Sequence, residues 1–433
     1  MFKNLANFFK AKDIRSKILF TLGLLIVYRL GAHLTVPGVN AKALGNLGDS
    51  GIFGLLNTFS GGQLGNYSIF AMGVSPYITA SIVVQLLQMD IIPKFVEWSK
   101  QGEVGRKKLN QVTRYLTIVL AFIQSFGISF GFNSLAAFGF IKNPGTTTYL
   151  SIALILTAGT MFLMWIGEQI TAYGMGNGTS IIIFAGIVSR IPEGIMNFYN
   201  QQLKNAGKQL PMKIGFTVAL VVAILLIVVL VIYMQQAARK IPIQYSKRAG
   251  SQLTGSQSTH LPLKVNSAGV IPVIFASSFI ITPQTILQLF ATSQGNQQWF
   301  KVLNSIFDYQ KPIGAVLYAV LIIVFTYFYA FIQVNPEKVA ENLQKQGGYI
   351  PSVRPGKGTE KYISKLLVRL STVGALFLGL IAILPILASN LWKLPQGIML
   401  GGTSLLIIVG VALDTMRQLE GQVAKRNYRG FIN

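Results

Sequence analysis

Histidines and carboxylates are the residues of this sequence most suited to acid–base chemistry, and few of them lie in its apolar stretches. The two histidines are His33, at the end of an apolar stretch, and His260, in a polar segment. Glu168 and Asp414 lie near the ends of two other apolar stretches. An ionisable group deep in a membrane is costly and usually functional. At a stretch end, a carboxylate paired with a nearby cation or backbone group is the expected arrangement.

Metal and nucleophile chemistry is equally poorly supported by the sequence. The chain has no cysteine, which excludes disulfides, thiolate metal sites and cysteine nucleophiles. No HExxH pattern occurs, and no pair of candidate catalytic residues lies within an apolar stretch. The sequence therefore predicts no catalytic residue, no metal site, no cofactor and no enzymatic activity.

The glycine-rich run Gly174–Ser180 superficially resembles a phosphate-binding loop. No lysine follows the glycines, and no strand-like segment precedes them, as a phosphate-binding loop requires. The run joins two apolar stretches, so we interpret it as a tight turn whose following helix is capped by Thr179 or Ser180.

Two isoleucine pairs have a spacing that suggests a different function. Ile78 and Ile82 are four residues apart, as are Ile183 and Ile187, so each pair lies on one face of a helix. Isoleucines that face a common axis from several helices form a hydrophobic constriction, which excludes water and ions. The alternative is ordinary packing against lipid or a neighbouring helix.

The elements that must position these residues are apolar stretches of membrane-spanning length. Of the 433 residues, 52% are hydrophobic and 12% charged, whereas soluble domains are about one quarter charged. A helix of roughly 20 apolar residues crosses a bilayer core. We predict ten such helices at about 18–34, 69–91, 115–132, 149–173, 179–196, 214–234, 268–290, 313–334, 366–391 and 398–416.

The distribution of basic residues predicts which side of the membrane each loop occupies. With the N-terminus in the cytoplasm, 27 of the 37 Lys and Arg fall on the cytoplasmic side. Such a bias is typical of inner-membrane proteins. It explains the net charge of +24 without nucleic acid and predicts that both termini are cytoplasmic. The segment 1–17 is interpreted as a cytoplasmic start rather than a removed signal peptide.

Three loops differ from simple connections. Two long cytoplasmic loops, at about 236–267 and 335–365, are either docking surfaces for a soluble partner or solvated loops that only set topology. The external segment 52–70 is apolar but interrupted by glycines. Irregular backbone survives at membrane depth only where protein or a water-filled cavity covers it. This segment therefore folds back inside the protein as a short helix, or lies on the membrane surface as an amphipathic helix.

Two function classes remain compatible with these residues. Scarce acids within the spans disfavour an ion-coupled transporter, but a multi-span secondary transporter of a neutral small solute remains possible. A passive channel is the other class.

Several motifs resemble the SecY family, the channel subunits of the bacterial Sec protein translocase. They occur in family order across essentially the whole chain. The motifs are Phe59-Ser60-Gly61-Gly62, Pro76–Ile82, Gly159–Thr171, Gly176–Ile187, Gln257–Ser278, Asn335-Pro336, Val353–Gly356 and Gly401–Ile407. The loop between Arg239 and His260 matches only loosely.

The resemblance implies an all-α polytopic membrane protein with ten transmembrane helices in two pseudo-symmetric halves, residues 1–200 and 201–433. A re-entrant plug helix is expected at about 57–70, and a lateral gate between spans two and three and spans seven and eight. Carried over by position, the pore ring is Ile78, Ile82, Ile183, Ile187, Ile274 and Ile407. The plug residues are Asn57, Phe59, Ser60, Gly61, Gly62, Leu64, Tyr67 and Ile69.

The same resemblance implies the function and partners of the chain. The expected function is a protein-conducting channel that translocates unfolded secretory polypeptides and releases membrane segments laterally into lipid. Expected partners are SecE-like and SecG-like small membrane subunits, a SecA-type ATPase, the ribosome, precursors bearing signal sequences, and the lipid bilayer of a bacterial plasma membrane. The residues expected to dock cytoplasmic partners are Arg354, Lys247, Arg248 and Lys357.

Overall fold

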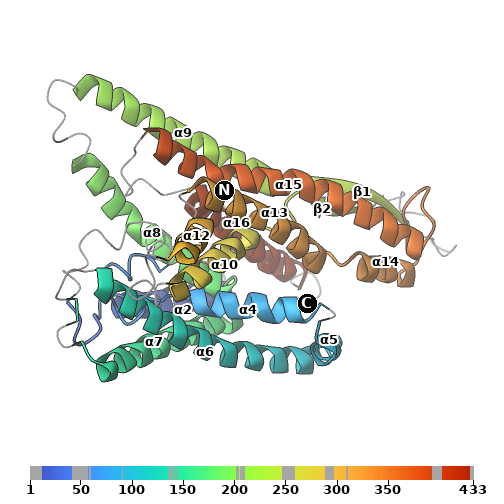
Figure 1. The fold of residues 1–433 in the computed structure, drawn as a ribbon. Helices are drawn as coiled ribbons and strands as arrows, with labels where there is room; N and C mark the ends of the chain where they lie inside the picture. The colour runs from blue at the N-terminus through green and yellow to red at the C-terminus, as the bar shows by residue number, and fades with distance from the viewer. Residues whose placement is uncertain are drawn as a thin grey trace.

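The fold is almost entirely helical, as the sequence predicts for a membrane-spanning chain (Figure 1). It was determined as a computed structural model. The structure describes residues 12–40, 57, 60–89, 91–135, 140–141, 144–200, 204, 210–245, 259–287, 297–308, 311–392 and 402–429.

Up to residue 236, the described residues form seven helices, five of them at least 20 residues long. They are α2 (Lys12–Gly31), α4 (Ser75–Leu87), α5 (Pro93–Lys100), α6 (Glu103–Leu135), α7 (Thr146–Tyr173), α8 (Gly178–Phe198) and α9 (Leu210–Gln236). Beyond residue 236, the described residues form three short strands and six helices. They are β1 (Ala238–Tyr245), β2 (Thr259–Lys264), α10 (Ile271–Leu287), α12 (Gln298–Phe307), α13 (Pro312–Gln333), α14 (Pro336–Lys345), β3 (Gly348–Tyr349), α15 (Lys357–Trp392) and α16 (Gly402–Arg429).

Each of the ten predicted apolar stretches overlaps one of these helices. Within the described residues, six helical segments are long and apolar enough to cross a membrane by length and composition. The segments that contain α4 and α10 are shorter apolar helices. The prediction of an all-α polytopic membrane protein is therefore confirmed.

The spanning helices pack in two groups that meet along α10 and α16. In the first group, α4 packs on α6, α6 on α7, and α7 on α8. In the second, α13 packs on both α10 and α15, and α9 on α16. Between the groups, α10 lies against α4 and α6, while α16 lies against α8 (Figure 1).

One large hydrophobic core extends through both groups, and α9 lies at its margin. Leu225 and Val229 of α9 expose 59% and 65% of their surface. Nearly all of the most apolar part of this helix lies at the protein surface. An apolar helix surface of this extent is stable only against lipid or another protein.

A small folded unit forms at the end of the molecule where α14 lies. Strand β1 pairs antiparallel with β2 and, at its far end, with β3, so the strand order is β2-β1-β3. This sheet was not predicted: it joins the two long loops at 236–267 and 335–365. Its apolar side chains share a second core with α14 and α15. The buried members of that core are Ile241, Ile243, Leu263, Leu343, Ile350 and Ile363.

Local sequence explains where α14 begins. The Asn335 side chain accepts a hydrogen bond from the backbone N–H of Lys338 at 3.1 Å. Pro336 occupies the first helical turn, where its missing N–H costs nothing. The Asn335-Pro336 motif is thus a helix start signal.

Candidate functional site

The six isoleucines assigned to the pore ring are all buried in the large core. Ile78 and Ile82 lie on α4, and Ile183 and Ile187 on α8. The remaining two, Ile274 on α10 and Ile407 on α16, come from the other helix group. Each exposes between 0% and 6% of its surface, and all belong to one hydrophobic cluster. The structure therefore brings residues from four separated helices into one apolar core.

The plug segment is also buried, but its described residues are mostly turns. Asn57 is helical, whereas Ser60–Phe70 forms successive turns with one bridge between Ser68 and Thr35. Phe59 lies outside the described residues. Leu64 and Tyr67 are completely buried, and Gly62 and Ile69 are half-buried.

Asn57 organises the first turn of the plug segment. Its backbone carbonyl accepts hydrogen bonds from Gly62 N at 2.7 Å and from Ser60 Oγ at 3.2 Å. Its side-chain Oδ1 accepts from Gly65 N at 3.0 Å. These bonds satisfy buried polar groups that would otherwise make an irregular segment unstable in the core.

Tyr67 fixes the other end of the plug segment. Its hydroxyl lies 2.7 Å from Ser129 Oγ of α6, and its carbonyl accepts from Val36 N at 3.1 Å. The ring packs edge-on against Phe140, with ring centroids 4.9 Å apart. The segment is therefore held between α6 and the end of α2.

Two glycines allow the plug segment to touch α8 directly. A Cβ atom added to Gly61 would lie 2.5 Å from Gly186 Cα, closer than real Cβ atoms approach. Gly61 also has φ +72°, which favours glycine. Gly186 lies between Ile183 and Ile187 in the sequence, so the plug segment meets α8 at the level of the isoleucines.

A small polar cluster joins α4, α6 and α10, the helices of the expected lateral gate. The hydroxyls of Thr79 and Thr282 lie 3.1 Å apart. Gln124 Nε2 of α6 donates to Thr282 Oγ1 at 3.0 Å. The sequence analysis did not predict this cluster, because the pairing of Thr79, Gln124 and Thr282 depends on tertiary contact. Pro283, next to Thr282 inside α10, was the local sequence feature that could have drawn attention to this part of the helix.

At the N-terminal end of α8, a cavity of about 440 Å³ is lined by polar and charged groups. Asp414 shares it with Lys264 and Arg417. Burial lowers the pKa of Lys264, and Arg417 lowers it further, while Asp414 acts in the opposite direction. Among the described residues, Asp414 forms neither a close ion pair nor a hydrogen bond, but its charge acts on the nearby Lys264 ammonium.

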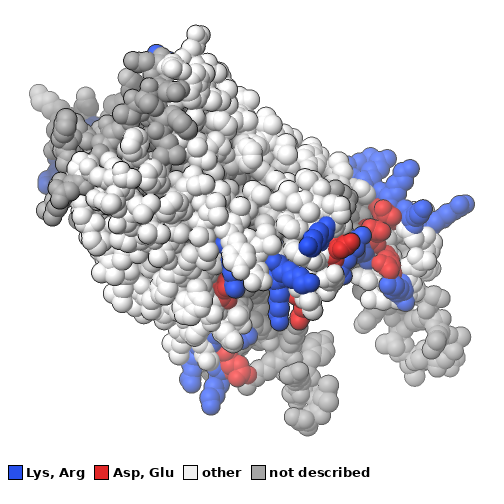
Figure 2. Space-filling model, turned by 60° about the horizontal axis from the view of Figure 1, so that its bottom comes forward, with Lys and Arg blue, Asp and Glu red and all other residues white. Residues whose placement is uncertain are grey.

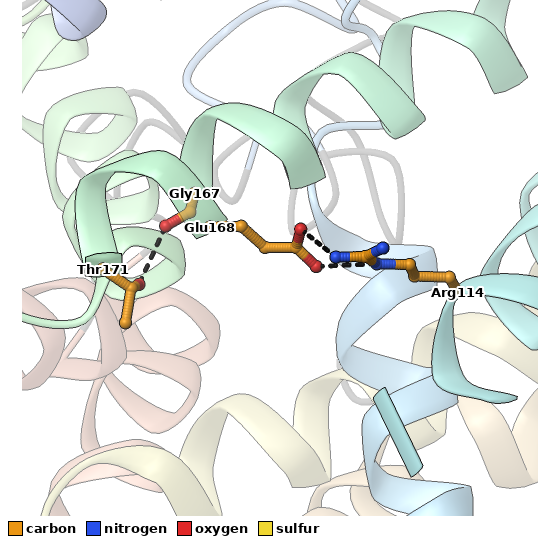
Figure 3. Close-up of polar contacts among 4 residues, drawn as sticks. All are labelled: Arg114, Gly167, Glu168 and Thr171. Atoms are coloured by element: carbon orange, nitrogen blue, oxygen red, sulfur yellow. Dashed lines mark hydrogen bonds and ion pairs between the residues drawn. The ribbon is translucent and has the colours of Figure 1, made fainter. Parts of the chain in front are cut away.

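Glu168 has the ion-pair partner that the sequence analysis expected. Arg114 of α6 donates from Nη2 and Nε to the two carboxylate oxygens, at 2.6 Å and 3.1 Å (Figure 3). This bidentate geometry makes the ion pair stronger than a single-contact one. It ties α6 to α7 and gives Glu168 a structural role.

The turn after α7 is ordered by a threonine and an asparagine. Thr171 Oγ1 donates to Gly167 O at 2.8 Å (Figure 3) and accepts from Gly178 N, also at 2.8 Å. Asn177 caps α8 by accepting from Ser180 N at 3.3 Å. The expectation of a tight turn is confirmed, but the cap at Thr179 or Ser180 is wrong: the turn leaves Asn177 in the extended cap conformation.

Exposed basic residues gather at one end of the molecule. Figure 2 shows Lys and Arg toward the end at which α5 and α14 lie in Figure 1. Arg354 is exposed there in the turn before α15, and Lys357 is exposed at the first position of α15. Lys247 and Arg248 lie outside the described residues.

Comparisons with known proteins agree with this architecture. The SecY family model matches residues 68–416. A protein translocase subunit SecY of Bacillus licheniformis is 60% identical, and one of Bacillus subtilis 59% identical, each over the full length of both chains.

Solved structures give the same fold. A protein-conducting channel superposes with a TM-score of 0.68 at 18% identity, covering 94% of this chain and 91% of the other. Sec61 in the canine ribosome-channel complex gives 0.65, also at 18%, covering 94% and 91%. The chain belongs to the SecY family.

Proposed function

We propose that the chain is the protein-conducting channel of a Sec translocase and that its six buried isoleucines form the constriction. The observation that carries this proposal is their common burial in one core, although they come from four helices in two groups. Branched apolar side chains surround a moving polypeptide without offering it a binding site. In its absence, an apolar neck is unfavourable for water and ions.

The plug segment supplies a second barrier. Its glycine contact with α8 and its anchor at Tyr67 support a resting position beside the isoleucines. A chain entering the channel displaces this segment, at the cost of the hydrogen bonds made by Asn57 and Tyr67.

The lateral gate lies where α10 meets α4 and α6. The helices that flank it come from the two proposed halves, residues 1–200 and 201–433. Hydrogen bonds between spanning helices contribute about 0.6 kcal/mol each on average. The bonds of Thr282 are therefore weak enough to break when a signal sequence enters.

Partner proteins supply the energy for translocation and select the precursors. The sheet, α14 and Arg354 form a folded surface at the basic end, which fits a SecA-type ATPase or a ribosome. Identity near 60% to translocase subunits supports SecE-like and SecG-like small subunits as further partners. We place the basic end and both termini in the cytoplasm, in a bacterial plasma membrane, by the positive-inside rule.

A crosslinking experiment tests the path. A photoreactive residue is placed at Ile183, and a precursor is stalled midway with the ATPase and small subunits present. The matched control is Val222 on α9, which exposes 56% of its surface. We expect a crosslink at Ile183 that requires both precursor and ATP, and none at Val222. Export without a crosslink at Ile183 would mean that the path lies elsewhere.

A further inference from the structure

Helix α12 was not predicted from the sequence, and it carries an exposed apolar face. Trp299, Val302 and Leu303 expose 41%, 51% and 36% of their surface. The helix packs on α10 and α13, two helices of the proposed gate. Its place in the chain, between these two spans, puts it on the external side in the proposed topology. The inference below rests on that topology.

The residues of α12 divide into three sectors. Consecutive residues of an α-helix are turned by about 100°, so Phe300, Asn304 and Phe307 fall within about 60° of one another. Phe300 is buried, and Asn304 Oδ1 accepts from Gln284 Nε2 of α10 at 3.5 Å. This sector therefore faces the protein.

The two remaining sectors differ in chemistry. The apolar sector is centred about 110° from the protein-facing one, and the polar sector about 130° from it on the other side. The apolar residues are Trp299, Val302, Leu303 and Ile306. The polar residues are Gln298, Lys301 and Ser305. A helix with separate apolar and polar faces beside a membrane lies in the plane of the interface.

The neighbouring helix identifies lipid as the occupant of the apolar sector. Ile313, Val316 and Val320 of α13 expose 62%, 63% and 48% of their surface and start directly after the loop that follows α12. These are lipid-facing residues of a spanning helix, and α12 contacts the same helix. Tryptophan and lysine are also typical of the level of the headgroups.

We propose that α12 is an interfacial helix that inserts its apolar sector into the outer leaflet and anchors α10 and α13 there. The protein-facing sector, through Phe300 and Asn304, transmits this anchorage to the gate. Ligands of this surface are outer-leaflet phospholipids, held by burial of apolar area rather than by recognition of a headgroup.

Single cysteines test the proposal, because the chain has none of its own. Val302→Cys and Leu303→Cys probe the apolar sector, and Lys301→Cys and Ser305→Cys are matched controls on the polar sector. A membrane-impermeant maleimide is added outside intact cells. Apolar burial raises the pKa of a thiol, and each unit lowers the reactive thiolate about tenfold. We expect labelling at 302 and 303 at least about tenfold slower than at 301 and 305.

Three outcomes overturn the proposal in distinguishable ways. Equal labelling of the two pairs would place α12 in water, with the channel function unaffected. Slow labelling at 302 and 303 that persists in detergent would mean that protein covers this face. Labelling of the controls only after permeabilisation would place the loop inside the cell and overturn the proposed topology as well. Export activity of each variant, measured in the same cells, establishes that it has folded.

Discussion

At the residue scale, the proposed constriction and its plug contact depend on apolar side chains and on glycines, which have no side chain. The isoleucine side chains are branched and contain no polar atom. Gly61 and Gly186 have no side chain at all, so the plug segment and α8 can touch. Spacing suggested Ile78, Ile82, Ile183 and Ile187 as constriction residues, since pairs four apart share a helix face. Ile274 and Ile407 have no such partner, and only the family resemblance pointed to them.

Replacing Ile407 with Asn is expected to open the resting constriction to ions. Ile407 is completely buried, and an amide placed there without partners costs about 1–3 kcal/mol unless water enters. Reconstituted channels should therefore conduct ions without a precursor and accept weaker signal sequences. Ile407→Leu is the matched control and should remain sealed. Equal conductance of the two variants would contradict the role of Ile407.

Replacing Gly186 with Val is expected to displace the plug segment. A Cβ atom there would lie 3.1 Å from Gly61 Cα and 3.0 Å from the Tyr28 hydroxyl, and the branched side chain adds further overlap. Resting ion leakage should rise while export continues. Gly215→Val on α9 is the control, because a Cβ atom at Gly215 has no atom within 4 Å. Leakage that rises equally in both variants would exclude the contact as its cause.

At the element scale, hydropathy located the spanning helices but not their ends. Helix α6 begins at Glu103 and α16 ends at Arg429, well beyond the predicted 115 and 416. Helical hydrogen bonding continues outside lipid, where polar side chains no longer mark it. The short helices α12 and α14 and the sheet were missed because each is stable only through packing on distant segments.

Cysteines at positions 79 and 282 are expected to lock the gate. The hydroxyls of Thr79 and Thr282 are 3.1 Å apart, so the double variant Thr79→Cys/Thr282→Cys brings two sulfurs within bonding reach. Oxidation should block insertion of membrane segments, and reduction should restore it. Each single variant is the control and should be insensitive to oxidant. Normal insertion by the fully oxidised double variant would show that these helices need not part.

At the scale of the whole molecule, charge and apolar surface are segregated. Basic residues gather at one end (Figure 2), whereas α9 and α13 carry many exposed apolar side chains. Composition and loop charge predicted this layout. The contacts between helices could not be read from one sequence, because lipid-facing and pore-facing isoleucines look alike.

Reversing the charge at the basic end is expected to weaken partner docking. Arg354→Glu together with Lys357→Glu should slow association of the ATPase or ribosome several-fold, and the defect should shrink at high salt because exposed charges are screened. Lys301→Glu on α12 is the control. Binding is measured with channels in lipid nanodiscs. An equal defect in the control would point to net charge rather than to this surface.

In the proposed channel, helices α4 and α10 each contribute to both the constriction and the gate. On α4, Thr79 lies beside Ile78 in the chain, and α10 carries both Ile274 and Thr282. A rigid helix cannot move one of these residues and leave the other in place. Widening the neck and parting the gate are therefore thermodynamically linked, and linkage is reciprocal. A polypeptide that holds the neck open lowers the free energy of opening the gate, and a signal sequence in the gate lowers the free energy of opening the neck by the same amount.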